Sequence, residues 1–171
     1  MRFRELIVSL LVFGMVSGCG YRLAARKGDV GSGQTLAVPT FANNTLTYRI
    51  EQRMSEAIRK ELARRTHYTV TSGNTGDVVL RGEVLDYSTS PTVFDQNGRA
   101  AQYALGLSVK VSITENATGK VLFENPAMIF RETFQLSRNP GDFVPEDPAA
   151  VERLASRFAS SVVASLVHRQ P

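Results

Sequence analysis

The chain has 171 residues, with 20 Lys and Arg against 16 Asp and Glu and a net charge of +4 at pH 7. This weak basic surplus comes without an aromatic–basic binding motif, which argues against a nucleic-acid partner. One cysteine excludes an internal disulfide, and two histidines far apart in sequence give a metal site little support. We expect His67 and His168 to lie at helix C-termini, where a positive charge is favourable.

The N-terminus has the layout of a secretory signal peptide. Arg2 and Arg4 precede an uncharged apolar run over residues 6–16, and small residues follow it. A helix of that length spans about 16 Å, roughly half the hydrocarbon core of a bilayer. The pattern therefore predicts a signal peptide over residues 1–18 rather than a transmembrane helix.

The end of this run, Val16-Ser17-Gly18-Cys19, resembles the bacterial lipobox, in which the cysteine is acylated and becomes the new N-terminus. A lone thiol in an exported protein is free, intermolecular or modified, and a buried structural cysteine is the less favoured alternative. We predict a diacylglycerol and an N-acyl chain on Cys19, which together give a firm membrane anchor. No other cofactor is expected. Gly20, rather than Asp, follows the cysteine and by analogy favours the periplasmic face of the outer membrane.

Residues 19–34 carry several glycines without periodicity and predict a flexible linker with a reach of about 20–23 Å. The range 35–168 is predicted to form a single domain, since a chain of this size buries enough surface for one core. At its start, Leu36 and Val38 share one face of a short strand. Pro39 predicts that this strand lies at an edge or ends there.

Two amphipathic helices are predicted. The first, over residues 46–65, carries a stripe of apolar residues at helical spacing: Leu46, Ile50, Met54, Ala57, Ile58 and Leu62. Its opposite face is rich in Arg and Lys, which we interpret as a solvated face in preference to a lipid-binding one. The second helix begins at Asp147 and Pro148, an N-cap followed by a first-turn proline, and runs to about His168.

Between the helices the period changes to that of strands, at residues 68–71, 78–89, 103–114 and 120–137. The turn Asn97-Gly98 predicts a hairpin between the two middle strands. The strand from Tyr103 alternates apolar residues with small ones, among them Gly106, Ser108 and Ser112. The order β–α–β–β–β–β–α predicts an α/β fold of the α+β type. We expect a two-layer sandwich, with a mostly antiparallel sheet of four or five strands and both helices on one face.

No constellation of catalytic residues is found. The sequence holds no Gly-x-Ser-x-Gly motif and no P-loop, because Gly31-Ser32-Gly33 lacks the lysine that a P-loop needs. Glu132 lies between Phe130 and Phe134, where it is either a carboxylate with a perturbed pKa or turned to solvent by a sheet edge or bulge. We favour the second interpretation and predict that the protein is not an enzyme.

The order of short motifs along the whole mature chain resembles the LptE family of lipopolysaccharide-assembly lipoproteins. The matching segments are Cys19-Gly20-Tyr21-Arg22-Leu23, Val38-Pro39-Thr40-Phe41, the first helix, Leu80-Arg81-Gly82-Glu83-Val84, residues 87–91, Val93-Phe94-Asp95-Gln96-Asn97-Gly98, Tyr103 and the Ala-rich last helix. The resemblance implies a plug in the lumen of the LptD outer-membrane β-barrel, which helps the barrel to assemble and to insert lipopolysaccharide.

In that family a basic residue after Val-Phe is a proposed glycolipid contact. Here Asp95 holds that position and Arg99 ends the turn. Arg99 and Lys110 are the candidate lipopolysaccharide contacts, and surface charges without a ligand are the default interpretation of both. A second resemblance stays open. Residues 36–43 are also similar to the first strand of lipoproteins that activate a peptidoglycan synthase or build a secretion pore.

Overall fold

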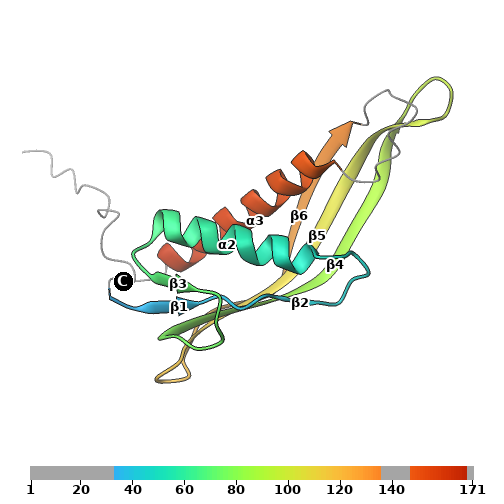
Figure 1. Cartoon of the computed structure of the whole chain (residues 1–171). Coiled ribbons are helices and arrows are strands. Elements are labelled where there is room, and N and C mark those ends of the chain that lie inside the picture. The colour runs from blue at the N-terminus through green and yellow to red at the C-terminus, as the bar shows by residue number, and fades with distance from the viewer. Residues whose placement is uncertain (1–32, 136–146, 169–171) are drawn as a thin grey trace, which may run out of the picture.

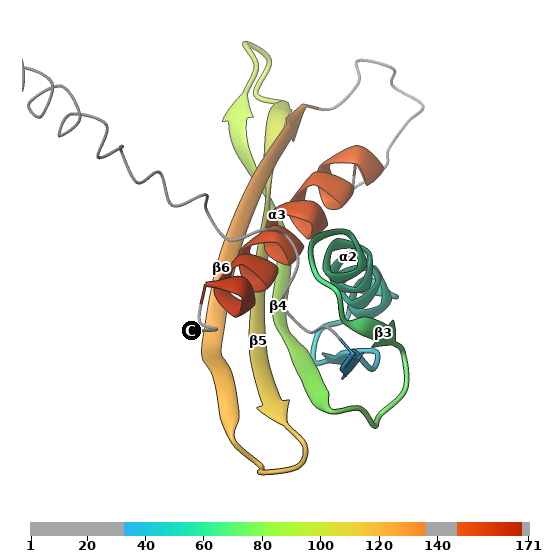
Figure 2. The ribbon, with the colours of Figure 1, turned by 90° about the vertical axis from the view of Figure 1, so that its left-hand side faces the viewer.

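The computed structural model describes residues 33–135 and 147–168. Within them the elements are β1 (Thr35–Ala37), β2 (Ala42–Asn43), α2 (Ile50–Arg65), β3 (Thr69–Thr71), β4 (Val78–Phe94), β5 (Ala100–Glu115), β6 (Val121–Gln135) and α3 (Pro148–Val167). A sheet forms one layer and the two helices form the other, on one face of it (Figure 1; Figure 2). The predicted α+β sandwich is confirmed.

The sheet is open and mixed, with strand order β3-β1-β4-β5-β6 and β2 beside β4. The long strands β4, β5 and β6 are antiparallel neighbours, as predicted, whereas β1 runs parallel to both β3 and β4. Helix α2 makes the crossover that parallel β1 and β3 require. Because β1 lies inside the sheet, Pro39 marks the end of the strand and not a sheet edge.

One apolar core joins the layers. In this core, the α2 residues Ile50, Met54, Ile58 and Leu62 pack against the inward residues of β5 and the apolar stripe of α3. The predicted stripes are thus confirmed, with one correction at the start of α2. This helix begins at Ile50 and not at Leu46, whose side chain is fully exposed.

Two motifs that are distant in sequence meet in this core. Phe41, just after β1, lies over Gly82 of β4, where an added Cβ would come within 2.3 Å of the Phe41 ring. The same ring meets Phe158 of α3 edge-on, with 6.2 Å between ring centroids. Gly82 therefore provides the space in which an aromatic side chain joins the sheet to the helix layer.

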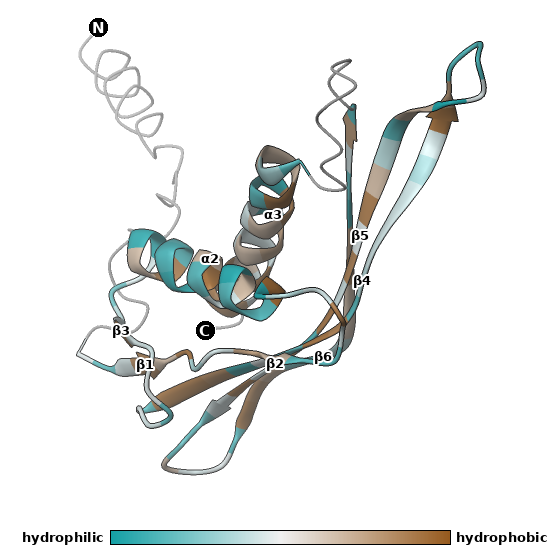
Figure 3. Ribbon diagram, turned by 45° about the vertical axis from the view of Figure 1, so that its right-hand side comes forward, coloured by the Kyte–Doolittle hydropathy of each residue, from teal (hydrophilic) through white to brown (hydrophobic). Residues whose placement is uncertain are grey.

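The β4–β5 hairpin extends beyond both helices and ends in a hydrophilic turn (Figure 3). Strand β4 continues through Pro91 to Phe94, beyond the predicted end at residue 89. In the turn, Asp95 accepts hydrogen bonds from the backbone N–H groups of Asn97 and Arg99, at 2.8 and 2.9 Å. Gly98 takes a φ of 73°, so the predicted Asn-Gly turn has one left-handed residue, its glycine.

Candidate interaction surfaces

The sheet face away from the helices is nearly flat at its centre. Gly106, Ser108 and Ser112 of β5 point outward between the buried residues of the same strand, and Ser88 of β4 lies opposite Gly106. Around them the strand register places charges of both signs: Arg81, Glu83, Lys110, Glu124 and Arg131. The face is therefore mostly polar and of mixed charge, with Ile129 of β6 exposed opposite Ser108, and its small residues let another surface approach the backbone of β5 closely.

The two cations predicted to bind lipopolysaccharide lie far apart. Arg99 ends the hairpin turn, while Lys110 lies on the outer face of β5 opposite Glu83 of β4. Eleven residue steps lead from Arg99 to Lys110, which is about 36 Å at the usual rise per residue of a strand. One phosphate group cannot contact both, so the structure does not bring these residues into a single site.

At the hairpin turn, backbone hydrogen bonds from Arg99 and then Asn97 lower the pKa of the Asp95 carboxyl, and the Arg99 charge adds to this. The carboxylate orders the turn and occupies the position where the family resemblance led us to look for a cation. Arg99 therefore projects from an ordered but exposed tip.

The structure contradicts the prediction that Glu132 turns to solvent. It lies on edge strand β6, yet it faces α3 and not solvent, with its side chain 15% exposed. Arg153 and Arg157 donate to its two carboxylate oxygens, each at 2.9 Å. The hydrogen bond from Arg153 is the main cause that lowers the pKa of Glu132, and the Arg157 bond and both charges outweigh the opposing effect of desolvation. Glu132 is thus a structural clamp between β6 and α3.

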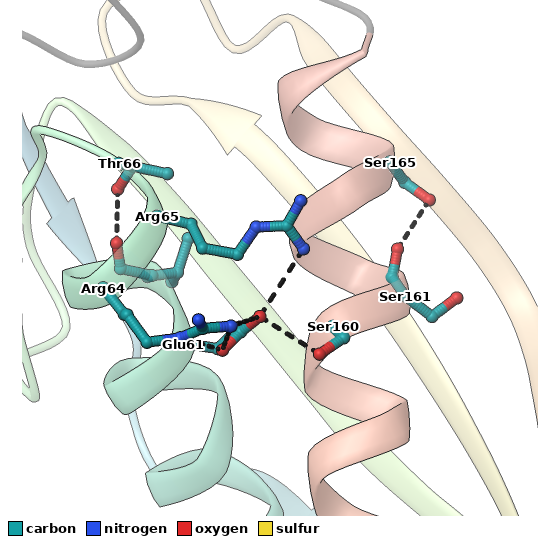
Figure 4. Close-up of polar contacts among 8 residues, drawn as sticks. Glu61, Arg64, Arg65, Thr66, Ser160, Ser161 and Ser165 are labelled. Atoms are coloured by element: carbon teal, nitrogen blue, oxygen red, sulfur yellow. Dashed lines mark hydrogen bonds and ion pairs between the residues drawn. The ribbon is translucent and has the colours of Figure 1, made fainter. Parts of the chain in front are cut away.

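A second carboxylate ties α3 to α2 (Figure 4). Glu61 accepts hydrogen bonds from Arg64 at 2.8 Å and from Ser160 of α3 at 3.0 Å, and Arg65 lies 3.5 Å away. Desolvation raises the pKa of Glu61, but the hydrogen bonds from Arg64 and Ser160 and the two arginine charges lower it overall. Part of the predicted basic face of α2 is therefore engaged within the protein, and Arg59 adds to this by donating to the Val38 carbonyl at 3.0 Å.

The described part of the chain holds no group of three or more His, Cys, Asp or Glu side chains that could bind a metal. Neither of its helices is both long and apolar enough to cross a membrane. Residues 1–32 lie outside the described residues, so the signal peptide and the lipidation of Cys19 remain predictions.

The family model for LptE, described as lipopolysaccharide-assembly, matches residues 33–166, which include every strand and helix described above except the last residue of α3. The chain belongs to the LptE family. This confirms the resemblance inferred from the motifs and makes the chain a member of a family of non-enzymatic envelope lipoproteins that work with the lipopolysaccharide transport machinery. No curated protein sequence matches this LptE-family chain.

Solved structures share the fold at low sequence identity. A putative lipoprotein from Caulobacter crescentus is 16% identical, with a TM-score of 0.53 over 77% of this chain and 93% of that one. PelC from Paraburkholderia phytofirmans, a dodecamer, is 17% identical, with a TM-score of 0.53 over 84% and 91%. Protein XCC0632 from Xanthomonas campestris is 12% identical, with a TM-score of 0.52 over 81% and 91%. These likenesses establish the fold of this LptE-family chain and not its partner.

Proposed function

We propose that this protein is an outer-membrane lipoprotein that acts with an LptD-type β-barrel, as its plug and assembly partner, to insert lipopolysaccharide into the outer leaflet. The observation that carries the proposal is the family match over residues 33–166. The protein would act by binding and not by catalysis.

The geometry supports a plug in two ways. The outer face of the sheet is flat along β5 at Gly106 and Ser108, so a barrel wall can approach the backbone of that strand closely. On β6, Ile129 lies opposite Ser108 and is 67% exposed, which offers an apolar contact beside it. The β4–β5 hairpin projects beyond the helices as a narrow arm, which suits insertion into a lumen (Figure 1). Lipidation of Cys19 would hold the domain at the periplasmic face of the outer membrane, with residues 20–34 as the tether.

Arg99 and Lys110 keep their proposed role as contacts for lipopolysaccharide phosphates, but as two separate contacts. Arg99 would act at the tip of the arm and Lys110 on the flat face. Such a separation suits a ligand that moves along the protein better than one held in a single pocket.

Co-purification tests the proposal. The full lipidated chain, extracted in mild detergent, is expected to bring down an outer-membrane β-barrel at one-to-one stoichiometry. Intact-mass measurement of the same preparation is expected to show an acylated N-terminal Cys19. A pull-down that yields only peptidoglycan enzymes would contradict the barrel partnership.

The second candidate function is a secretion pore built from several copies of the chain. The likeness to the PelC dodecamer favours it, although at 17% identity that likeness extends to the fold alone. The mass of the detergent-extracted particle separates the two, because a pore requires a homo-oligomer whereas a plug requires one copy beside a barrel.

A further inference from the structure

The connection between β2 and α2 exposes two large apolar side chains that the fold does not use. Leu46 is fully exposed and Tyr48 is 79% exposed, whereas the helix that follows buries its apolar residues almost completely. The connection leaves the sheet beside another exposed residue, Leu85, since the Asn44 N–H donates to the Val84 carbonyl at 3.0 Å. We name residues 44–49 the anchor loop.

The anchor loop is ordered by its own hydrogen bonds. The Asn43 side chain accepts from the Thr45 N–H at 2.9 Å and donates to the Thr47 carbonyl at 2.9 Å and to the Glu51 carboxylate at 2.8 Å. Thr45 in turn accepts from the Thr47 N–H at 3.2 Å. These bonds fix the backbone on both sides of Leu46.

The anchor loop also carries backbone strain. Arg49 is the one residue other than glycine with a positive φ, 61°, among those described. Its guanidinium lies over the Tyr48 ring, 4.8 Å from the ring centroid, and so restrains that ring. An ordered loop that keeps Leu46 and Tyr48 in water at the cost of backbone strain indicates selection for something outside the domain.

The order of the loop and its charge favour a protein pocket over a lipid surface. A fluid bilayer accepts apolar side chains in many orientations, whereas a shaped pocket gains affinity from side chains that are already fixed. Tyr and Arg are also the residues most often found at the energetic centres of protein interfaces. Arg49 of the loop and Arg53 beside it are exposed, whereas the acids Glu51 and Glu83 accept hydrogen bonds from Asn43 and Asn44. A partner pocket that complements the charge of this loop would therefore carry carboxylates around its rim.

We infer that the anchor loop inserts Leu46 and Tyr48 into an apolar pocket with a carboxylate rim on a partner protein. The inference rests on the proposed function in one respect, since it takes that partner to be the β-barrel. It goes beyond that function by assigning the contact to a loop outside both the hairpin arm and the flat sheet face.

Affinity measurement tests the inference on the full lipidated chain in detergent. Leu46→Ala with Tyr48→Ala is expected to weaken binding to the purified barrel about 30-fold or more, the loss typical of at least one hot-spot residue. Arg53→Glu is expected to weaken it several-fold, and more strongly at low salt. The matched control is Glu152→Ala with Ser156→Ala, two exposed residues of α3 that lie outside the anchor loop, the hairpin arm and the flat sheet face, and its affinity is expected to match the wild type. The loop variant is expected to fold normally, and its thermal melt serves as the check.

The outcomes separate the inference from the proposed function. If the wild-type chain binds the barrel and the loop variant binds within about threefold of it, the anchor loop is not a contact and the proposed function stands. If the wild-type chain does not bind the barrel, both the proposed function and the inferred pocket on the barrel are refuted. A photo-crosslinker in place of Tyr48, in intact cells, gives a barrel adduct if the inference holds. An adduct with lipid only, or barrel adducts no more frequent than those from a crosslinker at the exposed position 156 of α3, would overturn it.

Discussion

Substitution of Gly82 by Ala tests the contact that joins the sheet to the helix layer. An added Cβ would lie 2.3–2.4 Å from three atoms of the Phe41 ring, far inside van der Waals contact. The Phe41 ring cannot move aside easily, for three reasons. It is 4% exposed, it abuts Phe158, which is fully buried, and the Phe41 backbone N–H is fixed by a 2.9 Å bond to Ser55 Oγ.

The expected cost follows from two opposing effects. Overpacking of a core by one carbon costs about 1–3 kcal/mol. Replacement of Gly by Ala also restricts the unfolded chain, which restores about 0.4–1 kcal/mol. We therefore expect Gly82→Ala to lower the free energy of unfolding by about 1–2 kcal/mol, or the melting temperature by about 2–8 °C.

Thermal and urea denaturation, followed by circular dichroism, measure this effect. The matched control is Gly106→Ala, whose Cβ would meet the Ser88 hydroxyl at 2.9 Å on the outer sheet face, where that side chain is exposed and can rotate. We expect the control to change stability by less than about 0.5 kcal/mol. Phe41→Leu in the Gly82→Ala background is expected to recover part of the loss, with a coupling energy of about 1 kcal/mol. Equal stability of the two alanine variants, or simple additivity with Phe41→Leu, would refute the reasoning.

Two further predictions concern charge. Glu132→Gln is expected to lower the free energy of unfolding by about 1 kcal/mol at neutral pH, because it removes the carboxylate that Arg153 and Arg157 share. The folded-state pKa of Glu132 lies below its usual 4.5. Its contribution to the free energy of unfolding is therefore present above pH 4.5 and is lost as the pH falls through the lowered pKa. A difference in stability between wild type and variant that stays constant from about pH 7 into the acid range would contradict this. Reversing Arg99 and Lys110 together is expected to weaken lipopolysaccharide binding, and the single effects should add because the residues are about 36 Å apart. Unchanged binding at low and at moderate salt would exclude both residues.

The elements with a strong internal period could be predicted from the sequence. The apolar stripe of α3 packs as its 3.6-residue spacing predicts, and Asp147 accepts the capping hydrogen bond from the Ala149 N–H at 3.0 Å. Strand β5 alternates from Leu105 to Ile113 because one face of this part is covered by the helices and the other is not. In each case a single local rule decides the outcome, so tertiary context has little to override.

Features set by tertiary context could not be predicted. Leu46 fits the helical spacing of α2, but the hydrogen bonds of Asn43 hold the chain in a loop until Ile50. Strand β2 has two residues and exists only because β4 pairs with it. The position of β1 between β3 and β4 depends on the α2 crossover, and no local pattern in a three-residue strand encodes its neighbours.

The candidate site was predictable in its residue types and not in its geometry. Arg99 and Lys110 were found as exposed cations near the hairpin, but the distance between them depends on how far β5 runs, and the structure has it continuous from Ala100 to Glu115. Glu132 was misread because the sequence shows its apolar neighbours and not its partners. Arg153 and Arg157 follow 21 and 25 residues later, on α3.

The polar contacts divide the molecule into a layered body, which they hold together, and a hairpin arm that projects from it. Glu61 and Glu132 hold α3 from two sides, and Phe41 over Gly82 fixes the sheet beneath the helices, so the layered body has little freedom to rearrange. No other described element forms a second layer on the hairpin arm beyond it, and a two-stranded ribbon by itself is only marginally stable in water. The protein nevertheless extends both strands of this arm and orders its tip through Asp95. Stability of the domain does not require that length, so the arm is better explained by contact with something outside the chain, in keeping with the plug role proposed for it.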